Sequence, residues 1–140
     1  HGPAYQVLHN SWRSGDQVIG LLSQKLPANH QPENLPTIAT PRLIELCFQT
    51  AGIWEMGVQL RMGLPYHIDR LNILRSSTKP DGPEGKMHAV VSPGADGNFN
   101  ATVIDSKGDV HLTVEGYRTM ELPNAVENTQ LKPLKDIFNH

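Results

Sequence analysis

The chain has 140 residues, with 12 Lys and Arg against 14 Asp and Glu, which gives a formal net charge of -2. This length suits one compact domain. Because a near-neutral chain lacks the dense positive face that binds a phosphate backbone, nucleic acid is not expected as a partner. Hydrophobic residues make up 38% of the chain and charged residues 19%, a composition too apolar for a disordered protein. No apolar run approaches the roughly 20 residues that cross a bilayer, so no membrane segment is expected.

The cysteine and histidine content narrows the possible chemistry. Cys47 is the single cysteine, which excludes an intrachain disulfide and a Cys-rich zinc site. None of the seven histidines has the His-x-His or His-x-x-x-His spacing of a metal site, so no metal is predicted. We therefore expect a soluble, cytoplasmic domain. The chain opens without Met or a signal region, which suggests a piece of a longer protein.

The first half of the chain predicts one strand, one loop and one helix. Residues 16–23 are apolar on both faces, which indicates a buried strand. The prolines of residues 27–36 predict a loop. Thr40 can cap a helix that runs to residue 56, with Pro41 at its first position and Gly57 as its stop. Apolar residues cover most of this helix, so we expect protein around nearly all of it.

The second half reads as β structure. We predict an imperfect strand within residues 66–74, a loop over 76–85, and three antiparallel strands at 87–92, 99–105 and 110–122. In the last strand His111 alternates onto the polar face, where we expect it to be exposed. Residues 123–140 have weak periodicity and are predicted to form a C-terminal tail with a short helical end.

One buried helix followed by an antiparallel meander predicts an α+β domain over residues 1–122, in which a curved sheet wraps around the helix. This architecture is called a hotdog. A single copy leaves an open sheet edge and one incompletely covered helix face, so we expect it to pair with a second copy.

Four short segments along the chain form a recognisable series: HGPAYQ at residues 1–6, PRLIELCFQ at 41–49, LPYHID at 64–69 and EGYR at 115–118. Together they resemble the C-terminal hotdog of polyketide-synthase-type dehydratase domains, and are also similar to the dehydratases of polyunsaturated-fatty-acid synthases. The first segment resembles the family element Tyr/His-Gly-Pro-x-Phe/Tyr-Gln. The second resembles Pro-x-Leu-Leu-Asp-x-x-x-Gln/His, and the third resembles Leu-Pro-x-x-Ile. The fourth is similar to the sequence that closes the family's last long strand.

The resemblance implies half of a double hotdog that eliminates water from a β-hydroxyacyl thioester. In that family a His of the N-terminal hotdog removes the α-proton, and an acid of the C-terminal helix protonates the leaving hydroxyl. The substrate arrives on the phosphopantetheine arm of an acyl carrier protein, and no other cofactor is implied. The expected partners are this carrier protein and the N-terminal hotdog half, or a second copy of the chain.

The resemblance also assigns individual residues. Glu45 matches the catalytic acid, and Gln49 matches the residue that orients it. Tyr5, Leu43 and Phe48 are candidates for lining the acyl tunnel. The family usually has Asp where this chain has Glu45, so the carboxyl is displaced by about one C–C bond, and a shift of about 1 Å can cost on the order of 100-fold in rate.

The family's basic histidine lies in a His-x-x-x-Gly-x-x-x-x-Pro element, and no histidine of this chain has that context. The chain alone is therefore predicted to hold half of a site. Two other functions remain open from the sequence: a non-catalytic dehydratase-like scaffold or acyl-binding module, and a homodimeric hotdog thioesterase with a carboxylate on the same helix.

Overall fold

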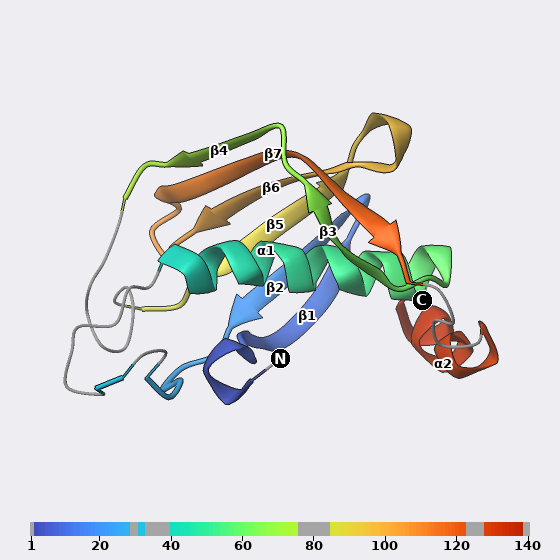
Figure 1. Cartoon of the computed structure of the whole chain (residues 1–140), viewed down its shortest axis with the longest axis horizontal. Helices are drawn as coiled ribbons and strands as arrows, with labels where there is room; N and C mark the ends of the chain where they lie inside the picture. The colour runs from blue at the N-terminus through green and yellow to red at the C-terminus, as the bar shows by residue number, and fades with distance from the viewer. Residues whose placement is uncertain (1, 29–30, 33–39, 76–84, 123–127, 139–140) are drawn as a thin grey trace.

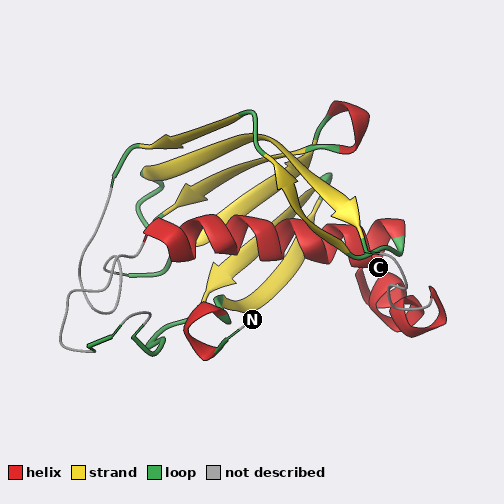
Figure 2. Cartoon of the chain, viewed as in Figure 1, coloured by secondary structure: helices red, strands yellow, loops and turns green. Residues whose placement is uncertain are grey.

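The computed structural model of the chain describes residues 2–28, 31–32, 40–75, 85–122 and 128–138. One curved antiparallel sheet lies behind a long helix (Figures 1 and 2). The strands are β1 (Leu8–Ser14), β2 (Gln17–Leu22), β3 (Gly63–His67), β4 (Arg70–Ile73), β5 (His88–Pro93), β6 (Phe99–Ile104) and β7 (Val110–Glu121). The helices are α1 (Thr40–Trp54) and α2 (Asn128–Phe138), with the π-helical turn η2 (Glu55–Gln59) and the 3-10 turns η1 (Pro3–Tyr5) and η3 (Ala95–Gly97).

The sheet has the strand order β1-β2-β5-β6-β7-β3, and β4 also pairs with β7. The two short strands β3 and β4 lie end to end along β7: β3 pairs with its C-terminal part and β4 with its N-terminal part. The edges of the sheet are therefore β1 on one side and β3 with β4 on the other. This arrangement confirms the predicted curved sheet around one helix.

The core lies between the concave face of the sheet and one side of α1. Alternate residues of β2, β5, β6 and β7 point inward because successive side chains of a strand face opposite sides. They meet the apolar stripe of α1 that includes Leu43, Leu46 and Cys47. The opposite side of α1 is only partly covered, and carries Ile44, Glu45, Phe48, Gln49 and Gly52. The prediction that protein surrounds nearly the whole helix is wrong for this side within this chain.

Several predicted elements are confirmed, namely β2, α1 and the meander β5, β6 and β7. The predicted strand at 66–74 is instead two strands, β3 and β4. The helix does not stop at Gly57, because the chain continues through η2 and ends at Leu60, which adopts a left-handed conformation with φ of 53°. Much of the two predicted loops lies outside the described residues.

Strand β1 was not predicted, and the C-terminal helix α2 gives form to the short helical end expected of the tail. Strand β1 pairs with β2 although most of its side chains are exposed. Within the predicted tail, α2 forms a helix whose Phe138 packs edge-on against Trp54 with ring centroids 6.0 Å apart, and also lies against Gly57. None of the described helices has the length and apolar character needed to cross a membrane.

Candidate active site

The structure brings Glu45 and Gln49 into direct contact. The Gln49 Nε2 donates to Glu45 Oε1 at 3.0 Å and to the backbone carbonyl of Tyr5 at 2.7 Å. The Gln49 Oε1 accepts the backbone N–H of Leu8 at 3.3 Å. Because both ends of the amide have partners, its orientation is fixed, and the Glu45 carboxylate is held by a donor that cannot rotate freely.

Helical spacing and a distant segment together build this contact. Residues four apart lie on one helix face, which places Gln49 one turn beyond Glu45. The segment from η1 into β1 runs beside that face and supplies the Tyr5 carbonyl and the Leu8 amide. The carboxylate therefore lies on the partly covered side of α1 and not in the core.

An aromatic stack borders the same side of α1. The rings of Phe48 and Tyr117 are stacked, with centroids 4.5 Å apart and an interplanar angle of 16°, and Phe99 lies 6.3 Å from Tyr117. Burial raises the pKa of Tyr117, and the nearby Glu55, Glu45 and Cys47 act in the same direction. One turn beyond Phe48, a Cβ added at Gly52 would meet no atom within 4 Å, so the space beside this face is open.

The three predicted lining residues differ in their placement. Tyr5 and Phe48 are half-buried and border the face that carries Glu45. Leu43 is 2% exposed and belongs to the hydrophobic core, on the side of α1 that faces the sheet. A lining role for Leu43 stays a prediction.

A second buried carboxylate, Glu55, was missed by the sequence analysis. It is 1% exposed, and its Oε2 accepts a 2.6 Å hydrogen bond from Thr119 and lies 3.1 Å from Arg61 Nε. Burial raises its pKa, while the Thr119 hydrogen bond and the Arg61 charge act against that rise. The sequence feature that could have pointed to Glu55 is a single acidic residue among the apolar residues at the end of the predicted helix.

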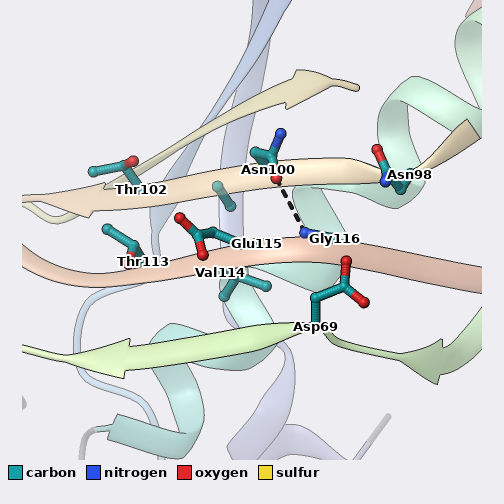
Figure 3. A pocket seen from close by; sticks show the side chains of 9 residues that line it. Asp69, Asn98, Asn100, Thr102, Thr113, Val114, Glu115 and Gly116 are labelled. Carbon is teal, nitrogen blue, oxygen red and sulfur yellow. Dashed lines mark hydrogen bonds between the residues drawn. The ribbon is translucent and has the colours of Figure 1, made fainter. Parts of the chain in front are cut away.

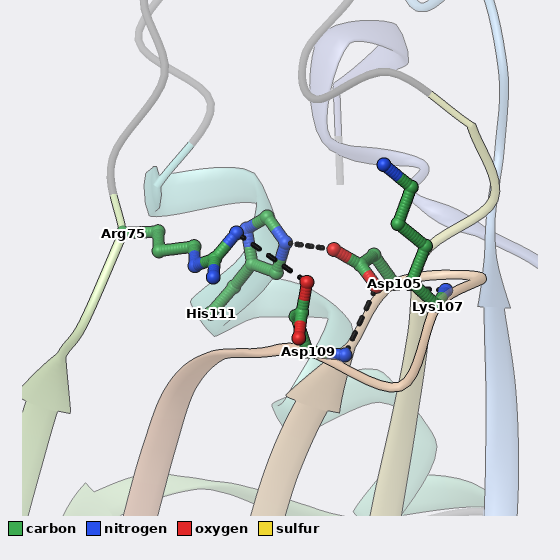
Figure 4. Close-up of polar contacts among 5 residues, drawn as sticks. All are labelled: Arg75, Asp105, Lys107, Asp109 and His111. Atoms are coloured by element: carbon green, nitrogen blue, oxygen red, sulfur yellow. Dashed lines mark hydrogen bonds and ion pairs between the residues drawn. The ribbon is translucent and has the colours of Figure 1, made fainter.

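Figure 4 shows a polar cluster at the turn between β6 and β7. His111 Nε2 lies 2.9 Å from Asp105 Oδ2, and the side chains are 11% and 14% exposed, so the expectation of an exposed His111 is wrong. Asp105 Oδ1 also accepts the backbone N–H groups of Lys107 and Asp109. The carboxylate satisfies the turn's backbone donors and covers the histidine.

An open groove lies on the face of the sheet turned away from α1 (Figure 3). It follows a bulge in β7 at Gly116, whose φ is 66° and whose N–H is bound by Asn100 Oδ1 at 3.0 Å. Asp69 and Glu115 are among its lining residues. The groove is separated from Glu45 by the sheet. Among the described residues, no three His, Cys, Asp or Glu side chains are grouped so that they could hold a metal ion.

A family model described as "polyketide synthase dehydratase N-terminal domain" matches residues 1–129. A comparison with curated proteins found no match. Among solved structures, the dehydratase domain from the CurK module of curacin polyketide synthase is similar, with a TM-score of 0.64 and 19% identity over 89% of this chain and 42% of that one. The dehydratase domain from the CurF module has a TM-score of 0.63 and 17% identity over 87% of this chain and 42% of that one.

The erythromycin dehydratase is also similar, with a TM-score of 0.55 and 19% identity over 84% of this chain and 37% of that one. At these low identities the structural similarity establishes the fold alone. The chain spans about two fifths of the length of the solved dehydratases that it matches.

The description of the matching model names an N-terminal domain, whereas the motifs of the sequence resemble the C-terminal hotdog. The match therefore establishes the family and not the half of the double hotdog. Since the model matches nearly the whole chain, and the described fold is that of the solved dehydratases, this chain belongs to the polyketide synthase dehydratase family.

Proposed function

We propose that the chain is the C-terminal hotdog of a β-hydroxyacyl-thioester dehydratase within a modular polyketide or fatty-acid synthase. Family membership supports the reaction class. The observation that carries the assignment of this half is the hydrogen bond from Gln49 to Glu45, which gives the motif of the C-terminal helix its expected geometry. A cytoplasmic location remains a prediction of the sequence.

In this proposal Glu45 is the general acid. It protonates the β-hydroxyl group as the C–O bond breaks, and the hydroxyl leaves as water. A base on the other half removes the α-proton, and the electrons of that C–H bond form the α,β double bond in a syn-type elimination. The Gln49 amide holds the carboxyl at the orientation needed for transfer, because proton transfer requires hydrogen-bond reach.

The acyl chain is proposed to lie along the open side of α1. Phe48, stacked on Tyr117, offers an apolar wall, and Tyr5 borders the same side. The substrate is carried on the phosphopantetheine of an acyl carrier protein, and the elimination needs no further cofactor. Leu43 is proposed to contribute to the tunnel from the core side of α1.

The partner half is proposed to pack against the edge formed by β3 and β4. Large exposed apolar side chains gather there, whereas the described β1 edge is mostly polar around Trp12. The apolar residues at the first edge are Leu64 and Tyr66 on β3, Leu71 and Ile73 on β4, Leu74 just after β4, and Met120 on the adjoining end of β7. An unpaired apolar edge invites association with another chain or domain.

The edge is tested with the chain by itself, which should self-associate. Light scattering should give a dimer that the double variant Leu71→Lys, Ile73→Lys converts to monomer, while Trp12→Lys at the other edge leaves the dimer intact. A wild-type chain that stays monomeric at all concentrations contradicts this assignment.

The reaction is tested in the whole protein that contains this chain, with a β-hydroxyacyl N-acetylcysteamine thioester. Glu45→Gln should lower kcat by about 10²- to 10⁴-fold, the usual contribution of a general acid. Glu115→Gln, an exposed carboxylate on the far face of the sheet, is the matched control and should leave kcat unchanged. Full turnover in Glu45→Gln, or no turnover in the wild type, would refute the proposal, and the latter result favours a scaffold or acyl-binding module.

A further inference from the structure

Arg42 is a buried cation in the first turn of α1. Its residue exposure is 4%, and burial lowers the pKa of its guanidinium, while the nearby Tyr5 acts against that effect. A positive charge near a helix N-terminus opposes the helix dipole. Within the described part of the chain, its hydrogen-bond partners are backbone carbonyls, those of Ala4 and Pro27, and no carboxylate is among them. Burying this charge costs desolvation free energy, so packing alone does not account for an arginine at this position.

The position of Arg42 on the helix supplies that reason. Arg42, Glu45 and Gln49 have the spacing i, i+3 and i+7, which places them along one stripe of α1. Glu45 lies between the other two. The segment from Ala4 to Leu8 runs along this stripe and is bound to it at both ends.

The two ends of the segment are held by different side chains. At one end, Arg42 Nε donates to the carbonyl of Ala4 at 3.1 Å. Gln49 donates to the carbonyl of the next residue, Tyr5, at 2.7 Å, and holds the other end of the segment by accepting the N–H of Leu8 at 3.3 Å. The same Gln49 nitrogen binds Glu45. The placement of Gln49, and through it that of Glu45, therefore depends on how firmly the segment is seated.

We propose that Arg42 is a positioning residue for Glu45, which it serves by holding Ala4 and so keeping the segment 4–8 seated on α1. The catalytic part of this inference, that Arg42 positions Glu45 for proton transfer, rests on the proposed function. The tether, by which Arg42 holds Ala4 and the segment 4–8 on α1, rests on the hydrogen bonds alone. The guanidinium is suited to the task because its rigid fork reaches carbonyls of two separate segments at once. A lysine ammonium or an apolar side chain cannot hold both in the same geometry.

The tether is tested by amide hydrogen exchange at Leu8, whose N–H donates to Gln49. Arg42→Met keeps a long side chain but removes the donors, and should accelerate exchange at Leu8 by about tenfold or more, since local opening becomes easier. Arg13→Met is the matched control. Arg13 also donates to a backbone carbonyl, that of Gly15 at 2.9 Å, but lies over Trp54 at the far end of α1. The Arg13→Met variant should therefore leave amide exchange at Leu8 unchanged.

The positioning role is tested in the whole dehydratase. Arg42→Met should lower kcat by about 10- to 100-fold with KM nearly unchanged, because a misplaced acid slows the chemical step and not substrate binding. Arg42→Lys should recover part of the loss, and it replaces Arg42→Met in both measurements if that variant does not fold. Arg13→Met should leave kcat unchanged.

Two results overturn the inference: exchange at Leu8 that is equal in the Arg42 and Arg13 variants, or a kcat that Arg42→Met and Arg42→Lys leave at the wild-type value. Failure of the proposed function is separate and is read from Glu45→Gln. If that variant turns over fully while Arg42→Met still accelerates exchange at Leu8, the tether stands and the catalytic assignment falls.

Discussion

The carboxylate of Glu55 accepts a 2.6 Å hydrogen bond from the hydroxyl of Thr119, which joins the start of η2, directly after α1, to the C-terminal part of β7. Arg61 lies 3.1 Å from the same carboxylate oxygen. The other oxygen, Oε1, is buried and has no hydrogen-bond partner among the described residues. The carboxylate is therefore only half satisfied, which explains why burial outweighs its two partners and raises its pKa.

This raised pKa predicts that stability falls as pH rises. The folded state favours the protonated form of Glu55, so its contribution is present below the unfolded value of 4.5 and is lost as pH rises through the higher folded pKa. Urea unfolding from about pH 4 to about pH 8 should show Glu55→Gln gaining stability relative to the wild type. Parallel pH profiles of the two proteins would contradict this reading.

Asp105 predicts the opposite sign. The hydrogen bond from His111 lowers its pKa, and the backbone N–H groups of Asp109 and Lys107 add to the effect. Its contribution to stability is present above the unfolded value of 3.8 and is lost as pH falls through the lower folded pKa. Asp105→Asn should therefore be destabilised above that value, with the difference from the wild type closing in acid.

The neighbouring Asp109 is the control for this experiment. It forms an exposed ion pair with Arg75 at 3.6 Å, a type of contact that contributes little. Asp109→Asn should change the unfolding free energy by less than about 1 kcal/mol. An equal loss in the Asp105 and Asp109 variants would show that His111 does not determine the effect.

Cys47 should be inert in the folded protein. It is 1% exposed, and burial raises the pKa of its thiol to about 12, so almost no thiolate forms at neutral pH. Iodoacetamide labelling followed by mass spectrometry should give no adduct until denaturant unfolds the chain. Labelling that proceeds at the rate of a free thiol would show that α1 opens readily.

Two glycines should respond oppositely to substitution by alanine. A Cβ at Gly20 would clash with Thr50 Oγ1 and lie 2.8 Å from Leu8 Cδ1, so β2 could no longer approach α1 as closely. Gly20→Ala should cost about 1–3 kcal/mol of unfolding free energy through overpacking. Gly52 lies on α1 with open space beside it, so Gly52→Ala should raise the unfolding free energy by up to about 1 kcal/mol through helix propensity. Thermal unfolding of both variants checks the pair.

Phe48 predicts a selective effect on substrate binding. If its ring forms a wall for the acyl chain, Phe48→Leu should raise KM about tenfold with little change in kcat, as loss of uniform binding does. Phe99→Leu is the matched control because its ring also packs near Tyr117 but is 1% exposed in the core. It should lower stability without a selective change in KM, and the same KM rise in both variants would remove the wall role from Phe48.

The local part of the site could be read from the sequence. The four-residue spacing of Glu45 and Gln49 on a helix predicts their proximity, and the structure has the contact at 3.0 Å. What remained hidden was the third partner, because the Tyr5 carbonyl belongs to a segment more than forty residues away. Glu55 was missed for a similar reason, since Thr119 comes from the far end of the chain.

The elements that could be predicted from the amino-acid order are those whose own side chains carry the periodic pattern: α1, β2 and the meander from β5 to β7. Strand β1 becomes evident only in the fold: residues such as His9 and Asn10 are exposed, and the strand exists because β2 offers backbone partners. The docking of α2 through Phe138 on Gly57 likewise appears only in the fold, as does the cover that Asp105 gives His111. Periodicity records which side of an element is apolar. Contacts between distant segments depend on where folding brings them, and burial and hydrogen-bond partners follow from that.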